Sequence, residues 1–112
     1  MARAALNAKA EDMVILDLRK LSYSFDFFLL CSASSDRRIE TVADYILEAL
    51  SQADLKPAHR EGRPDGGWLL LDFGPVVAHL FSPEAREFYK LERLWADAPQ
   101  VRLPKTRLHN PA

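Results

Sequence analysis

The sequence predicts an α/β (α+β) fold in which a mixed β-sheet of about five strands is packed by helices. Two observations lead to this fold class. Apolar runs of strand length recur along the chain, and between them lies one long segment with the apolar periodicity of a helix. The length of 112 residues also suits a single domain with one hydrophobic core.

The first part of the chain predicts a short helix followed by two buried strands. Residues 2–10 are rich in alanine, which favours a helix. Residues 12–18 and 27–31 are apolar runs, separated by a serine-rich loop at 22–24. Because neither run alternates between polar and apolar residues, we expect both to be central strands that are covered on two faces.

A long amphipathic helix is expected after the second strand. Residues 32–36 are rich in side chains that cap helix N-termini. Apolar side chains then recur at helical spacing and predict a stripe that faces the sheet: Ile39, Val42, Ala43, Ile46, Leu47 and Leu50. The helix must end before Lys56, because Pro57 disfavours helical geometry in the residue that precedes it.

Three further strands follow the long helix. A weak strand at 58–61 leads into a glycine-rich turn at 62–67. Strands at 68–72 and 76–81 are close enough in sequence to form an antiparallel hairpin. The long helix therefore connects the second strand to the third, and we expect these two strands to lie parallel.

One more helix and a tail are expected to complete the chain. Ser82 is a good N-cap and Pro83 a good first helical residue, and the helix they begin should end before Asp97. Residues 101–112 contain two prolines and no periodicity, which is typical of a flexible tail. We therefore expect one domain over 1–100, followed by this tail.

The charge is divided unevenly between these two parts. The whole chain has 15 basic and 16 acidic side chains, a net charge of −1. The tail carries Arg102, Lys105 and Arg107 without any acid, so residues 1–100, with 12 basic and 16 acidic side chains, carry −4. An acidic body repels nucleic acid and suits a basic protein partner.

Composition also narrows the function classes. A single cysteine, Cys31, cannot form an intramolecular disulfide, and neither a signal-peptide pattern nor a membrane-length apolar run is present. The histidines His59, His79 and His109 lie singly, without the spacing of metal ligands. We therefore expect a cytoplasmic protein with no membrane contact and no metal site.

Motifs that carry catalytic chemistry are weak. Residues 72–74 (DFG) match the magnesium-binding tripeptide of protein kinases, but a glycine-rich phosphate loop and a catalytic HRD segment are missing. Serines at 32–35 lie where nucleotidyltransferases place a Gly-Ser pair, but no Asp-x-Asp pair supplies the carboxylates that Mg²⁺ would need. Helix capping and a glycine turn explain these residues better, so we predict no catalytic residue and no cofactor.

A stronger candidate for a binding surface lies on the strand at 68–72. Trp68, Leu70 and Asp72 share one face of this strand because side chains alternate along it. Tryptophan is enriched at interface hot spots, so this face is either an exposed binding patch or the core face beneath a helix. Asp72 and His79 are also a candidate pair across the hairpin.

Several motifs, in a specific order and spacing, resemble the Iojap family of ribosomal silencing factors. The most informative are residues 68–74 (WLLLDFG), 77–81 (VAHLF) and 86–95 (REFYKLERLW). Residues 10–12, 16–18, 26–28, 34–37 and 61–62 also fit this family, so the resemblance covers roughly residues 9–98. It implies a fold similar to that of nucleotidyltransferases, without their catalytic residues.

The resemblance implies a regulatory and non-enzymatic function. Such factors bind the large ribosomal subunit through large-subunit ribosomal protein fourteen, block joining with the small subunit, and so repress translation when nutrients are limiting. The basic tail would then be an auxiliary contact to ribosomal RNA. Two alternatives stay open: a nucleotidyltransferase-like nucleotide-binding module or enzyme, and a free homodimer in which the Trp68 face is covered.

The resemblance also implies where the partner would bind. The family tryptophan that matches Trp68 belongs to the docking surface. Strand geometry adds Leu70 and Asp72, and we expect the rim of this partner-binding surface to be Tyr89, Leu91 and Glu92. The chain departs from the family pattern at Pro75, where an acid is usual, and in its short N-terminal helix.

Overall fold

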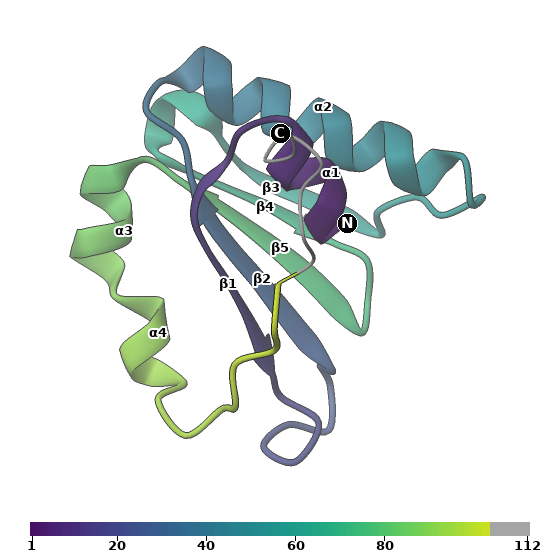
Figure 1. The fold of residues 1–112 in the computed structure, drawn as a ribbon, viewed down its shortest axis with the longest axis vertical. Coiled ribbons are helices and arrows are strands. Elements are labelled where there is room, and N and C mark those ends of the chain that lie inside the picture. The colour runs from purple at the N-terminus through teal and green to yellow at the C-terminus, as the bar shows by residue number, and fades with distance from the viewer. Residues whose placement is uncertain (104–112) are drawn as a thin grey trace, which may run out of the picture.

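The computed structural model describes residues 1–103, and within them one five-stranded sheet carries helices on both faces (Figure 1). The elements in chain order are α1 (Ala2–Asn7), β1 (Glu11–Asp17), β2 (Phe27–Ser32), α2 (Asp36–Ser51), β3 (His59–Arg63), a 3₁₀ turn (Pro64–Gly66), β4 (Trp68–Asp72), β5 (Val76–Phe81), α3 (Pro83–Tyr89) and α4 (Leu91–Leu94). The predicted α+β class with a mixed sheet is confirmed.

The order of the strands is β1-β2-β5-β4-β3. β4 and β5 form the predicted antiparallel hairpin, and β2 pairs with β5 in parallel. β2 and β3 run in the same direction, as expected, although β5 and β4 lie between them. The chain leaves β2 through α2 and returns at the far edge of the sheet, so β3 is an edge strand with all five residues exposed.

β1 is an edge strand as well, which corrects the prediction that it is central. It pairs only with β2 in the sheet, and several of its residues are half-buried or exposed. Its outer edge is covered locally by the chain after α4, where the Asp17 amide donates to the Pro99 carbonyl at 2.8 Å and the Val101 amide donates to Ile15 at 2.8 Å. These covering residues lie more than 80 positions away in the sequence. The apolar run alone therefore could not show whether β1 is covered by a neighbouring strand or by a distant segment of the chain.

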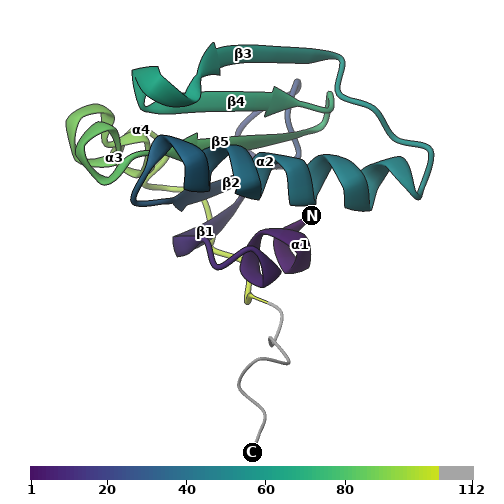
Figure 2. The same cartoon turned by 90° about the horizontal axis from the view of Figure 1, so that it is seen from above.

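α1 and α2 cover one face of the sheet, and Figure 2 shows α2 lying along the strands. The predicted helical stripe is buried at Ile39, Val42, Ala43 and Ile46, against side chains of β2, β4 and β5. The Ser35 hydroxyl accepts a hydrogen bond from the Arg38 amide at 3.1 Å, so the predicted capping role of this serine loop is confirmed.

α3 and α4 pack on the opposite face, and they are two helices rather than the single one predicted. The Ser82 hydroxyl caps α3 by accepting from the Ala85 amide. α3 then ends at Tyr89, because Lys90 adopts a left-handed conformation (φ 46°, ψ 51°) and α4 starts in a new direction. Leu91 and Trp95 anchor this second segment on a core cluster with Phe28 and Phe81.

Candidate functional site

An open groove lies beside Trp68, on the face of the sheet that α3 and α4 cover only in part. It has a volume of about 370 Å³. Its lining is Glu61, Gly62, Gly66, Trp68, Leu70 and Tyr89. Side-chain alternation along β4 explains the arrangement: Leu69 and Leu71 are buried beneath α2, while Trp68 and Leu70 are half-buried on the other face. The groove therefore combines an aromatic wall with a rim from the exposed strand β3.

The Trp68 ring is held on several sides. The Tyr89 ring packs against it with centroids 4.5 Å apart, and Phe81 lies at 5.1 Å. The indole Nε1–H donates a hydrogen bond to Nδ1 of His79 at 3.2 Å. Trp68 is thus partly a core residue and partly a surface residue. The two alternatives for this face, an exposed binding patch and a core face beneath a helix, therefore each hold for part of the ring.

The structure brings three of the six predicted site residues together in the groove: Trp68, Leu70 and Tyr89. Asp72, Leu91 and Glu92 lie outside its lining. The Asp72 carboxylate accepts from the Gly74 amide at 2.7 Å and stabilises the hairpin turn. The suggested Asp72–His79 pair is wrong, because Nδ1 of His79 accepts from the Trp68 indole and Nε2 of His79 has no hydrogen-bond partner among the described residues.

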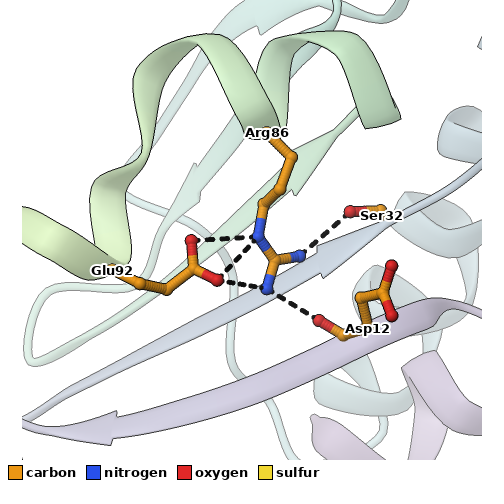
Figure 3. Close-up of polar contacts among 4 residues, drawn as sticks. All are labelled: Asp12, Ser32, Arg86 and Glu92. Carbon is orange, nitrogen blue, oxygen red and sulfur yellow. Dashed lines mark hydrogen bonds and ion pairs between the residues drawn. The ribbon is translucent and has the colours of Figure 1, made fainter.

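Glu92 binds Arg86, as Figure 3 shows. Nε and Nη2 of Arg86 donate to the Glu92 carboxylate at distances from 2.8 to 3.1 Å. Nη1 donates to the Ser32 hydroxyl at 2.9 Å, and Nη2 also donates to the Asp12 carbonyl at 2.8 Å. The Arg86 hydrogen bonds lower the pKa of Glu92 and keep it ionised. Arg86 thereby ties α3 and α4 to the ends of β1 and β2.

The surface next to the groove is apolar. Phe88 and Leu94 are 79% and 75% exposed, although both are large hydrophobic side chains. Tyr89 lies between them in sequence and is half exposed, with one part of its ring on Trp68. The Phe88 ring packs edge-on against Tyr89 with centroids 5.0 Å apart, so the groove continues into exposed apolar surface on α3. Exposed apolar surface of this kind marks interaction sites, and we take the groove and the α3–α4 segment together as the candidate docking surface.

Two side chains that could take part in catalysis, Cys31 and His79, are buried and neutral. Desolvation raises the pKa of the Cys31 thiol to about 12 and lowers the pKa of His79 to about 4. Within residues 1–103, no cluster of three or more His, Cys, Asp or Glu side chains is arranged to hold a metal ion. No helix in this part of the chain is long and apolar enough to cross a membrane.

Sequence reasoning missed two residues of the site. The sequence patterns present His79 only as a candidate metal ligand or partner of Asp72, and Arg86 only as part of a family motif. The signal for His79 is present in the hairpin register, which places Trp68 opposite Phe81 and diagonal to His79. No local signal identifies the Arg86–Glu92 pair, because residues six apart do not face each other in a continuous helix.

The fold and the groove define a small α+β domain with an open, partly aromatic groove on one face of its sheet. A family model described as "Ribosomal silencing factor during starvation" matches residues 1–112. The chain is 36% identical to the ribosomal silencing factor RsfS of Bacillus subtilis over 98 residues, covering 88% of this chain and 83% of that protein. It is also 36% identical over 104 residues to the chloroplastic protein Iojap of Zea mays, covering 93% of this chain and 45% of that longer protein.

Solved structures agree with these sequence matches. A crystal structure of a protein from Chromobacterium violaceum superposes with a TM-score of 0.79 at 29% identity, covering 92% of this chain and 82% of that one. One from Bacillus halodurans gives a TM-score of 0.77 at 33% identity, covering 89% and 90%. The chain belongs to the ribosomal silencing factor (RsfS/Iojap) family.

Proposed function

We propose that this chain represses translation by binding the large ribosomal subunit through large-subunit ribosomal protein fourteen and blocking joining with the small subunit when nutrients are limiting. The observation that carries the proposal is the candidate docking surface, where Trp68 and Tyr89 line an open groove and the α3–α4 segment exposes Phe88 and Leu94. Aromatic anchors at the edge of a pocket are typical of interface hot spots. This role requires no catalytic group and places the protein in the cytoplasm.

Charge supports a basic protein as the direct partner. Residues 1–100 carry −4, from 12 basic and 16 acidic side chains, and ribosomal proteins are basic. Opposite net charges steer association at moderate salt and lose this effect as salt screens them. Two basic residues of the predicted tail, Lys105 and Arg107, lie outside the described residues, which end at Leu103. Contact of the tail with ribosomal RNA is part of the proposal.

The size of the domain suits a steric mechanism. Its extents are 38 × 29 × 27 Å, which is bulky enough to hold two macromolecular surfaces apart if the domain is bound between them. Antagonism of this kind needs only affinity and bulk. A second copy that covers the docking surface in the free protein is the competing hypothesis for the exposed apolar side chains, and light scattering with and without the ribosomal protein separates the two.

The test is binding to purified large subunits by co-sedimentation. Tyr89 and Tyr45 form a matched pair, because they are 49% and 47% exposed but lie on opposite faces of the molecule. We expect Trp68→Ala and Tyr89→Ala each to weaken binding more than ~10-fold, the effect of a hot spot, and Tyr45→Ala to leave it unchanged. Unchanged binding of both groove variants, or an equal loss in Tyr45→Ala, would show that the partner binds elsewhere.

A further inference from the structure

The contact between Trp68 and His79 joins the docking surface to the core. Trp68 on β4 is paired with Phe81 on β5, and His79 is two residues earlier on the same face. The indole nitrogen therefore reaches His79 diagonally across the hairpin and donates to Nδ1 at 3.2 Å. The one polar atom of the indole thus points into the protein, and its carbon atoms are left to line the groove.

Packing alone does not require an imidazole at this position. His79 is only 4% exposed and its ring lies among aromatic neighbours, 4.6 Å from Phe28 and 6.2 Å from Phe81 between ring centroids. Because Nδ1 accepts the indole hydrogen, the imidazole proton must be on Nε2, and this buried atom has no hydrogen-bond partner among the described residues. An orphaned buried donor destabilises the fold, so an apolar residue of similar size would serve packing better.

We propose that His79 is a positioning residue that holds the Trp68 indole in the orientation in which the groove binds the ribosomal partner. This role of His79 rests on the proposed function. His79 would act through Trp68 and would not itself contact the partner. His79 is suited to this role because its rigid ring is fixed by Phe28 and Phe81 and offers one acceptor in the direction of the groove. The Tyr89 ring also packs against the indole, with ring centroids 4.5 Å apart.

Two substitutions separate the acceptor from the packing. His79→Leu removes the acceptor but keeps an apolar side chain, whereas His79→Asn places an amide oxygen near the position of Nδ1. In a ¹H–¹⁵N spectrum of the full chain, the indole resonance of Trp68 should move in His79→Leu and return toward its wild-type position in His79→Asn. The indole of Trp95, which packs on Phe28 instead, is the internal reference.

Binding to purified large subunits is then measured on the same variants. We expect His79→Leu to weaken binding about three- to tenfold, the value of one hydrogen bond, and His79→Asn to recover most of that loss. Val77→Ala is the matched control, because Val77 is buried on the same face of β5 and its loss destabilises the fold without removing the acceptor. This control should bind as the wild type does.

The outcomes distinguish the two proposals. If the wild type does not bind large subunits, the proposed function fails. If the wild type binds and His79→Leu binds equally well, or if Val77→Ala loses as much affinity as His79→Leu, then His79 acts only through stability and the inference is wrong. An indole resonance that does not move in His79→Leu would overturn it at the first step.

Discussion

Replacing Arg86 with methionine removes the guanidinium group while keeping an unbranched apolar stem in its place. The guanidinium has three kinds of acceptor: the Glu92 carboxylate, the Ser32 hydroxyl and the Asp12 carbonyl. Glu92 keeps 37% of its side chain exposed, so solvent screens this ion pair and its loss costs on the order of 1 kcal/mol. The other two hydrogen bonds are each worth about 1 kcal/mol, which gives a total of about 3 kcal/mol.

The assay is urea unfolding followed by near-ultraviolet circular dichroism, which reports the aromatic environment of Trp68 and Trp95. With a slope of roughly 1.5 kcal/mol per molar urea, a loss of about 3 kcal/mol lowers the midpoint by ~2 M, and the melting temperature should fall by ~10 °C. Glu92→Gln is the graded variant. It retains the contacts of Arg86 with Ser32 and Asp12, so it should lose only about 1 kcal/mol.

Acid titration adds a second measurement of the same pair. Arg86 lowers the folded-state pKa of Glu92 below its ordinary value of 4.5, so the stability from this carboxylate is present above pH 4.5 and is lost as the pH falls through the folded-state pKa. Glu92→Gln should not show this part of the acid loss. Wild-type stability in Arg86→Met, or a larger loss in Glu92→Gln than in Arg86→Met, would refute the reasoning that Arg86 ties the α3–α4 segment to the sheet.

Two further predictions concern residues next to Trp68. Burial lowers the pKa of His79 to about 4 in the folded state from 6.5 in the unfolded state, so the unfolded state binds more protons between these pH values. The free energy of unfolding should therefore fall by at most ~3 kcal/mol as the pH drops from 6.5 to 4. Measured by urea unfolding, this free energy should depend less on pH in His79→Leu, and an equal dependence would contradict the prediction. Gly62 has a φ of +83°, and a Cβ there would lie 2.1 Å from the Trp68 carbonyl oxygen. Gly62→Ala should therefore lower the stability measured by thermal unfolding by more than ~1 kcal/mol. Gly66→Ala, where a Cβ would meet nothing within 4 Å, should lower it less, and equal losses would contradict this prediction.

The parts of the structure that the sequence predicted correctly are those set by local patterns. The alternation of residues 68–72 predicted which side chains share a face, and the serines at Ser35 and Ser82 predicted where two helices start. The order of the strands was not predictable in this way. β1 has the apolar pattern of a central strand because α1 and the chain at Pro99 cover it, and neither contact is local.

The candidate site was predicted in part for the same reason. Trp68 and Leu70 followed from strand periodicity, and Tyr89 from the resemblance to the family. The hydrogen bond from Trp68 to His79 depends on the register of the hairpin, and the Arg86–Glu92 pair depends on the left-handed Lys90 that breaks the helix between them. A residue with a β-carbon rarely adopts this conformation, so a local pattern of good helix formers conceals the break.

If the Trp68 groove docks on the large subunit, the bound protein keeps the small subunit away. The most direct measurement is light scattering of purified small and large subunits as they join, with the protein added in stoichiometric amounts. We predict that the wild type reduces joining, and that Trp68→Ala at the same concentration does not, while Tyr45→Ala remains as effective as the wild type. If subunits join normally with the wild type bound, or if Trp68→Ala blocks joining as well as the wild type does, the account is wrong.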